Sequence, residues 1–144
     1  LKDRLLEWRA GAYDPREGAQ RLREATQADA VVVFSQTYCP FSRAVKRELD
    51  ARGVGYTAFE VDELPGGNVL VNELGKATGR TSIPHVFIGG ASCGGCNDAG
   101  AGGTLPGFRQ MVAVDGWLEE RLEEAARARA AENRPDRGRE RNRD

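Results

Sequence analysis

The sequence predicts a small α/β sandwich built on a four-stranded mixed sheet. The run Ala30-Val31-Val32-Val33-Phe34 is apolar and mostly β-branched, which is typical of a central strand covered on both faces. Segments with helical spacing alternate with the predicted strands, an order typical of α/β domains. Gly89-Gly90 joins two short strands as a tight hairpin turn, so the sheet also contains an antiparallel pair.

The first half of the chain is predicted to form two helical pieces and a βαβ unit. Residues 1–28 read as two helices, and Asp14-Pro15 starts the second. After the first strand, residues 40–52 form a helix, because proline suits the first turn and apolar side chains recur four residues apart. A second strand at 56–61 runs parallel to the first if this helix is a crossover.

The second half completes the sheet and adds further helices. Its apolar residues follow strand spacing around residue 90 and near-helical spacing elsewhere. The predicted elements are, in order, a turn at 64–67, a helix at 68–78, strands at 85–88 and 91–93, a glycine-rich stretch at 99–107, and helices at 108–114 and 117–131.

Length and composition predict one domain with charged ends. The chain has 144 residues, too few for two domains with separate cores. We expect a helical extension at 1–28, the α/β domain at 29–118, and a charged helix with a disordered tail at 119–144. The tail is rich in arginine and lacks apolar residues after Asn133. A solvated tail is the simpler interpretation, and weak contact with nucleic acid or a protein partner is the alternative.

Charge and cysteine content narrow the setting in which the protein works. The formal net charge is -1, so no overall field favours nucleic acid or an anionic membrane. No apolar run approaches about twenty residues, and we therefore expect no transmembrane helix. Three cysteines are too few for a disulfide-stapled secreted scaffold, which favours a reducing compartment. We expect the cytoplasm, or a plastid or mitochondrion if a leader preceded Leu1.

Cys39 is the candidate nucleophile. It lies in Thr37-Tyr38-Cys39-Pro40-Phe41-Ser42, between the first strand and the following helix. The free N–H groups and positive dipole end of a helix start favour the thiolate, and Arg43 and Lys46 are expected to lower the pKa of the thiol further. Ser42 stands where the Cys-x-x-Cys redox pattern has its second thiol. Cys39 is therefore predicted to react through a mixed disulfide and to need an outside thiol.

Two later motifs can bind a peptide-like ligand. In Thr81-Ser82-Ile83-Pro84, a cis Ile83-Pro84 bond would present the backbone N–H and C=O of Ile83 as a short strand edge. In Gly94-Gly95-Cys96-Asn97-Asp98, the last two residues occupy a predicted helix N-cap. Such a cap binds a carboxylate through backbone N–H groups, and the Asp98 carboxylate can hold an ammonium group. A plain strand start and a plain capped turn are the alternatives.

The three motifs, in this order, resemble the glutaredoxin family over roughly residues 30–98. Tyr38-Cys39-Pro40-Phe41-Ser42 resembles the active-site loop in a monothiol variant, Ser82-Ile83-Pro84 the Thr-Val-Pro segment, and residues 94–98 the glycine-glycine-x-x-Asp segment. The resemblance implies a thioredoxin-like three-layer sandwich, glutathione as cofactor, and an oxidoreductase that reduces protein–glutathione mixed disulfides by a monothiol mechanism. The implied partners are glutathionylated proteins or small mixed disulfides, with no nucleic acid and no membrane.

The resemblance also assigns roles to individual residues. Cys39 is the nucleophile, and a second glutathione serves as the outside thiol. Many members carry lysine at the position of Gln36, whose amide can donate a hydrogen bond but supplies no charge. The implied glutathione contacts are Gln36, Tyr38 beside the glutathione sulfur, Ser82, Ile83 along the cysteinyl backbone, Pro84, and Asn97 and Asp98 at the γ-glutamyl end.

Cys93 and Cys96 form a second pattern, Cys-x-x-Cys. Two thiols make an incomplete zinc site, since structural zinc usually has four protein ligands. His85 is the single histidine and is interpreted as structural. The resemblance instead places Cys96 beside the glutathione pocket, as a candidate resolving thiol for Cys39.

An alternative function uses the same cysteine as a metal-cluster ligand. Relatives with Cys-Gly-Phe-Ser form dimers that share a [2Fe–2S] cluster through two such thiolates and two glutathiones. Here Pro40 replaces the glycine and stiffens the loop. The Cys-Pro-Phe-Ser sequence is thus closer to the dithiol-derived class of glutaredoxins than to the Cys-Gly-Phe-Ser class. We therefore expect a monomer, and a dimer only if Cys39 binds a cluster. A third interpretation is an interaction module that recruits a partner through its ends, and the arginine-rich tail alone supports it.

Overall fold

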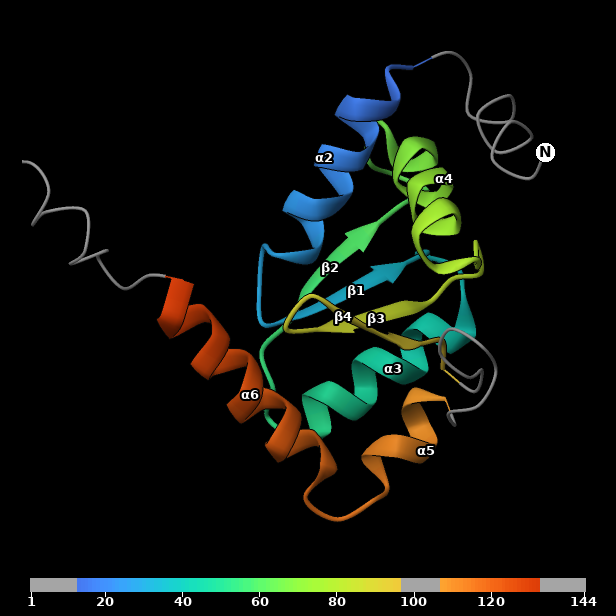
Figure 1. Ribbon diagram of the computed structural model, residues 1–144. Helices are drawn as coiled ribbons and strands as arrows, with labels where there is room; N and C mark the ends of the chain where they lie inside the picture. The colour runs from blue at the N-terminus through green and yellow to red at the C-terminus, as the bar shows by residue number, and fades with distance from the viewer. Residues whose placement is uncertain (1–12, 97–106, 133–144) are drawn as a thin grey trace, which may run out of the picture.

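The computed structural model describes residues 13–96 and 107–132 and shows a mixed sheet between two layers of helices (Figure 1). The strand order is β2-β1-β3-β4. The strands are β1 (Val31–Ser35), β2 (Thr57–Glu60), β3 (His85–Ile88) and β4 (Ala91–Gly94). The helices are α2 (Pro15–Thr26), α3 (Pro40–Ala51), α4 (Gly67–Thr78), α5 (Phe108–Val112) and α6 (Trp117–Glu132). The predicted three-layer sandwich with a four-stranded mixed sheet is confirmed.

The sheet combines one parallel and two antiparallel pairings. β1 and β2 are parallel, and α3 is the crossover between them, as the sequence predicts. β3 runs antiparallel to β1 and pairs with β4 through a turn in which Gly89 and Gly90 both have positive φ, 61° and 81°. Only glycine adopts such angles at no steric cost, which explains the glycine pair. Since β1 and β2 are parallel, the segments that follow them leave the sheet at the same edge.

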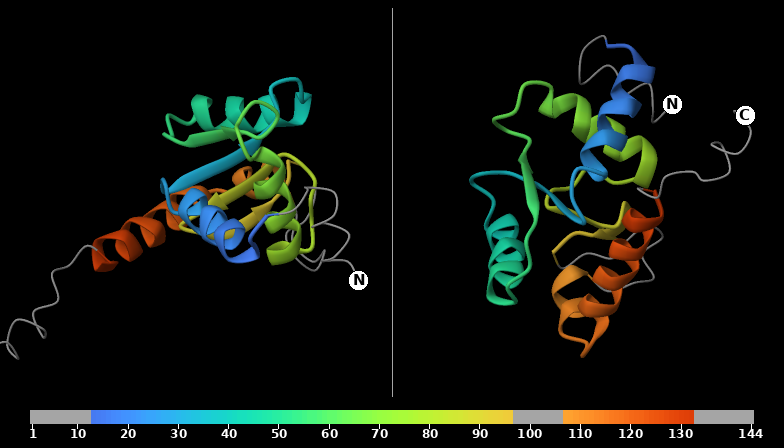
Figure 2. Two further views of the ribbon diagram at one scale, coloured as in Figure 1. Left: turned by 90° about the horizontal axis from the view of Figure 1, so that it is seen from above. Right: turned by 90° about the vertical axis from the view of Figure 1, so that its left-hand side faces the viewer.

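The two faces of β1 belong to two separate apolar cores. Val31 and Val33 pack with residues of α3, α5 and α6, whereas Val32 and Phe34 pack with residues of α2 and α4 (Figures 1 and 2). Successive side chains of a strand point to opposite faces, so a strand covered on both sides is apolar at every position. This geometry is the physical reason for the continuous apolar run in the sequence.

The observed elements differ from the predicted ones at their ends. The helix predicted at 108–114 ends at Val112, and the hairpin strand predicted at 91–93 extends to Gly94. α2, which falls within the predicted N-terminal extension, buries Leu22 against the sheet and so contributes to one of the cores. The division of the chain at residues 28 and 118 stays a prediction.

Several predicted features lie outside the described residues. They are the first helical piece within 1–12, the glycine-rich stretch as far as 106, the tail from 133, and the ligand-binding pair Asn97 and Asp98. Among the helices that are described, none is long and apolar enough to cross a membrane.

Candidate active site

Cys39 lies at the start of α3, at the edge of the sheet where β1 ends. It is the N-cap residue, with Pro40 in the first helical position. Its N–H donates to the Gln36 carbonyl at 3.1 Å, and its carbonyl accepts from the Arg43 N–H at 3.2 Å. The thiol is half-buried and unbonded to another cysteine. The predicted position of Cys39 at a helix N-terminus is confirmed, and its role as the nucleophile stays a prediction.

The surroundings of Cys39 favour its thiolate. Partial burial raises the pKa of the thiol, but hydrogen bonds from the Ser42 hydroxyl and from the backbone N–H groups of Ser42 and Phe41 outweigh it. The pKa of Cys39 therefore lies below its ordinary value of 9.0. Donors that point at a sulfur atom stabilise the negative charge, and this raises the fraction of reactive thiolate near neutral pH.

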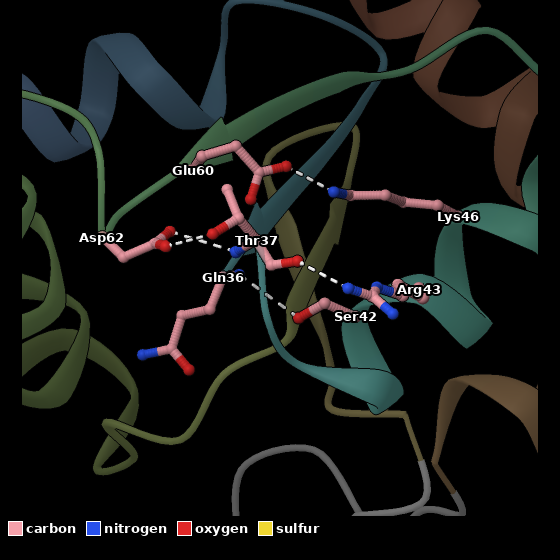
Figure 3. A network of polar contacts seen from close by, with 7 residues as sticks. All are labelled: Gln36, Thr37, Ser42, Arg43, Lys46, Glu60 and Asp62. Atoms are coloured by element: carbon pink, nitrogen blue, oxygen red, sulfur yellow. Dashed lines mark hydrogen bonds and ion pairs between the residues drawn. The ribbon is translucent and has the colours of Figure 1, made fainter.

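The basic side chains of α3 do not act as the sequence predicts. Arg43 and Lys46 were expected to lower the pKa of Cys39, yet neither is among the causes of its shift. Lys46 forms an ion pair with Glu60 of β2, and Arg43 Nη2 donates to the Thr37 carbonyl at 3.4 Å (Figure 3). Both cations are directed toward oxygen atoms of the neighbouring strand and loop.

Ser42 connects Cys39 to the end of β1. The residue is fully buried, and its hydroxyl oxygen accepts a hydrogen bond from the Gln36 N–H at 3.4 Å. A hydroxyl oxygen that already accepts a hydrogen bond still has its proton to donate, and here this proton serves the sulfur of Cys39. The serine at the position of the second thiol is thus part of the site.

The segment before β3 meets Cys39 from the other side. The Ile83-Pro84 bond is cis, one of the two alternatives that the sequence left open, and the Cys39 thiol lies 3.9 Å from the Ile83 carbonyl oxygen. Ile83 is half-buried and Ser82 is exposed, and the Ser82 hydroxyl accepts from Arg80 Nη2 at 3.0 Å. The structure therefore brings together two of the three motifs, whereas Asn97 and Asp98 of the third lie outside the described residues.

Two aromatic side chains near Cys39 are exposed. Tyr38 is 67% exposed and Phe41 is 55% exposed, although both are apolar over most of their surface. Gln36 lies at the end of β1 and is half-buried. Apolar surface next to a reactive group is typical of a place where a ligand or a protein docks.

Cys93 and Cys96 have an environment of another kind. Burial raises the pKa of Cys93 to about 11, against smaller lowering effects of the Ile88 backbone and Arg121. Cys96 is 3% exposed and packs in the apolar core with Val45 of α3 and Phe108 of α5. Within residues 13–96 and 107–132, no group of three or more histidine, cysteine or acidic side chains is arranged to hold a metal ion.

His85 is structural, as predicted. It is 1% exposed, its ring stacks on Phe87, and Nε2 lies 2.6 Å from the Ser92 hydroxyl. Burial, with help from the positive charge of Arg80, lowers its pKa to about 4. A neutral, fully packed imidazole of this kind cannot serve as a general base at the surface.

The sequence analysis missed Asp62 and the way it binds Thr37. Both Asp62 oxygens accept hydrogen bonds from Thr37, next to the candidate nucleophile (Figure 3). One signal was present in the sequence. A carboxylate that follows a strand parallel to β1 must lie at the same edge as the segment after β1, because parallel strands end together.

Comparisons with known proteins show which family the chain is similar to. The family model for glutaredoxin matches residues 31–99. Among curated proteins, a glutaredoxin of Ricinus communis is 41% identical over 81 residues, which are 56% of this chain and 79% of the relative. Glutaredoxin-C2 of Arabidopsis thaliana is 40% identical over 78 residues, or 54% of this chain and 70% of the relative.

The chain is also similar to solved structures of glutaredoxins. The holo form of glutaredoxin C1 from Populus tremula x tremuloides superposes with a TM-score of 0.64 at 34% identity, covering 77% of this chain and 91% of that one. A buckwheat glutaredoxin–glutathione complex has a TM-score of 0.64 at 29% identity, covering 77% and 92%. The motifs, the thioredoxin-like fold and the extent of the identity lead to one conclusion: the chain belongs to the glutaredoxin family of thiol oxidoreductases.

Proposed function

We propose that the protein reduces mixed disulfides between proteins and glutathione, with glutathione as its reductant and Cys39 as its one reacting thiol. The observation that carries the proposal is the contrast among its cysteines. Cys39 combines partial exposure with a lowered pKa, whereas the pKa of Cys93 is raised and Cys96 is buried in the core. Small glutathione mixed disulfides are substrates of the same kind.

The proposed cycle has two exchanges. The Cys39 thiolate attacks the glutathione sulfur of the mixed disulfide, the substrate sulfur leaves as a thiolate, and this thiolate takes a proton from water. The thiolate of a second glutathione then attacks the glutathione sulfur bound to Cys39. Glutathione disulfide leaves, and the Cys39 thiolate is restored. The cycle consumes one added glutathione: its sulfur is oxidised and joins the glutathione of the mixed disulfide as glutathione disulfide, while the substrate sulfur is reduced to a thiol.

The surroundings of Cys39 suit glutathione as the ligand. A tripeptide can lie against the exposed Ser82 and the half-buried Ile83, with Pro84 buried behind them and Tyr38 beside the sulfur. Gln36 at the end of β1 offers a hydrogen bond, and by the family resemblance Asn97 and Asp98 bind the γ-glutamyl end. The similar buckwheat protein was solved as a complex with glutathione, which supports this assignment.

The second exchange needs a thiol, and we assign that thiol to glutathione. Ser42 has no sulfur, and Cys96, the candidate resolving thiol, packs among Val45, Phe108 and other core residues. A disulfide between Cys39 and Cys96 stays a prediction. Intact mass after treatment with oxidised glutathione separates the two routes, because one glutathione adduct supports the monothiol cycle and a loss of two hydrogen atoms supports an internal disulfide.

The proposed function is tested by replacing the nucleophile. Cys39→Ser should abolish turnover in an assay with a glutathione mixed disulfide and glutathione as reductant. Cys93→Ser is the matched control and should retain the wild-type rate, because a half-buried thiol with a raised pKa holds little thiolate at pH 7. Turnover by the Cys39→Ser protein would overturn the proposal.

The alternative is a dimer that binds a [2Fe–2S] cluster. Such a cluster takes four thiolate ligands, and the site described here offers one from this chain, so a second copy and two glutathiones would supply the others. Pro40 in the first turn of α3 restrains the loop that would hold the cluster. Visible absorption and a dimer after anaerobic reconstitution with iron, sulfide and glutathione would support the cluster, and a colourless monomer would exclude it.

A further inference from the structure

Thr37, two residues before Cys39, is held at three of its polar groups. Its N–H donates to Asp62 Oδ1 at 3.1 Å, and its hydroxyl donates to Asp62 Oδ2 at 2.5 Å. Its carbonyl accepts from Arg43 Nη2 at 3.4 Å. A single carboxylate therefore binds both hydrogen-bond donors of Thr37 (Figure 3).

The register of the sheet explains why these two residues meet. The last aligned pair of the parallel strands β1 and β2 is Ser35 with Glu60, and the Val61 N–H donates to the Ser35 carbonyl at 2.9 Å. Thr37 and Asp62 each lie two residues beyond that pair. The contact therefore continues the β1–β2 pairing past the end of the sheet, by means of a side chain.

Asp62 is ionised and held in place by these bonds. The hydrogen bond from the Thr37 hydroxyl lowers the pKa of Asp62, slight desolvation opposes it, and the Thr37 N–H and the charge of Lys46 add to the lowering. Among the described residues, the charged groups drawn beside this contact are also Glu60, which pairs with Lys46, and Arg43. Hydrogen bonds to an ionised acceptor are about twice as strong as neutral ones, so a bidentate contact of this kind restrains the loop firmly.

We propose that Asp62 is a positioning residue. By holding Thr37, it keeps the loop at 36–39 in place against the start of α3, and this sets the reactivity of Cys39. Asp62 does not contact the sulfur. Its effect passes along the chain to Cys39, whose thiolate depends on donors of the first turn of α3, at Phe41 and Ser42. The inference rests on the proposed function in one respect, that Cys39 is the reacting thiol.

The variant Asp62→Ala separates two ways in which Asp62 could act on the pKa of Cys39, by its negative charge or by holding Thr37 in position. A nearby negative charge disfavours a thiolate, so if Asp62 acted through its charge alone, its removal would lower the pKa of Cys39. If Asp62 acts by position, the freed loop loses alignment with the donors of α3, and the pKa of Cys39 rises. We expect the rise, with alkylation of Cys39 by iodoacetamide at pH 7 slowed roughly three-fold.

The experiment follows the rate of Cys39 alkylation against pH in a set of matched variants. Thr37→Val, which lacks the hydroxyl, should slow alkylation as Asp62→Ala does, and Thr37→Ser, which keeps it, should behave as wild type. The double variant should be no slower than Asp62→Ala alone, because Asp62→Ala already removes the hydroxyl bond that Thr37→Val removes. Glu63→Ala removes an equal charge at the next residue, which does not bind Thr37, and should leave the profile unchanged.

The outcomes separate this inference from the proposed function. Asp62→Ala and Thr37→Val proteins with an unchanged or lowered Cys39 pKa would overturn the positioning role. Alkylation needs no glutathione, so the profile reads the loop even if the Cys39→Ser protein keeps its turnover and the proposed function fails. Thermal unfolding of each variant shows whether the fold is intact. Thr37 and Asp62 are both exposed, so we expect the variants to fold.

Discussion

The loop at the start of α3 and the strand β4 carry the same chemical group in opposite environments. Cys39 sits at a helix N-terminus, where a hydroxyl and two N–H groups lower the pKa of its thiol. Cys93 sits in a short edge strand, where burial raises the pKa to about 11. Cys93 belongs to the Cys-x-x-Cys pattern, whereas Cys39 belongs to the Cys-x-x-Ser pattern. Reactivity therefore follows the placement of a thiol in the fold rather than the spacing of cysteines in the chain.

The comparison is tested most directly by the pH dependence of labelling. With iodoacetamide, the labelling of Cys39 should reach its midpoint below pH 9, whereas that of Cys93 should still rise at pH 10. The gap between the two midpoints therefore exceeds about two pH units, which corresponds to a difference of more than roughly a hundred-fold in thiolate population at pH 7. Peptide mass spectrometry of the labelled protein measures both rates in one sample.

Unfolded protein is the control for this prediction. In concentrated urea the two environments disappear, and the two midpoints should converge on the ordinary value for a cysteine. Equal midpoints in the native protein would contradict the contrast, since they would mean that neither the helix start nor the burial affects the thiols.

Acid should lower the stability of the β3–β4 hairpin, which contains Cys93. His85 packs on Phe87 and bonds Ser92 in the neutral form, and its pKa is lowered from 6.5 to about 4. Below pH 6.5 the unfolded chain binds a proton that the folded protein refuses, so stability is lost as the pH falls from 6.5 toward 4. Between pH 7 and pH 5 we expect a loss of about 2 kcal/mol from this residue, or about thirty-fold in the unfolding constant.

Urea unfolding at the two pH values measures this loss. The variant His85→Gln keeps a hydrogen-bonding side chain without the titration, so its loss between pH 7 and pH 5 should be smaller by that amount. Because His85 is the single histidine of the chain, its NMR titration provides an independent reading. A midpoint near 6.5 in the folded protein would rule out the buried neutral imidazole.

The pattern of the sequence predicts the backbone of the site better than its side-chain contacts. The apolar run at 30–34, the glycine turn at Gly89 and the position of Cys39 before Pro40 follow from local rules of strands, turns and helix starts, and the structure confirms them. The place of Pro84 at a strand entrance left a cis bond and a plain strand start open, and the structure has the cis bond. Each of these features depends on residues that are neighbours in the chain.

The contacts that the sequence did not predict depend on the register of β1 against β2. That register brings Glu60 to Lys46 and Asp62 to Thr37, over separations of 14 and 25 residues. A one-residue shift would change every such pair, and no local pattern determines it. The sequence predicts that Lys46 acts on Cys39, because Lys46 lies on the first turns of the helix that follows it. A long, flexible side chain can reach several partners, and the sequence does not show that Lys46 binds Glu60 instead.

Removing the hydroxyl of Ser42 should bring Cys39 closer to an ordinary thiol. A hydrogen bond to a charged group contributes about 1.5 kcal/mol or more, so Ser42→Ala should raise the pKa of Cys39 by about one unit and lower the thiolate fraction at pH 7 up to about tenfold. The variant also leaves the N–H of the half-buried Gln36 without its acceptor, which should lower the melting temperature. The alkylation profile gives the first effect and thermal unfolding the second.

A control is needed because the substitution affects both reactivity and stability. Ser92→Ala removes a hydroxyl from the β4 side, where it bonds His85, and should lower stability without moving the Cys39 profile. If Ser42→Ala kept the wild-type profile, the lowered pKa would have to come from the helix backbone alone.

The smallest effect on Cys39 is expected at Lys46, although the sequence predicts that this cation lowers the pKa of the thiol. Lys46 lies on the first turns of α3, but it pairs with Glu60, and the side chains of both are 23% exposed. Lys46→Met keeps the aliphatic stem and should lower the stability by about 1 kcal/mol at most. The alkylation rate of Cys39 at pH 7 should change less than about two-fold, because a charge engaged by a carboxylate has little net field at the sulfur. A rate several-fold lower would show that the α3 cations, and not only the hydrogen-bond donors of its first turn, separate Cys39 from Cys93.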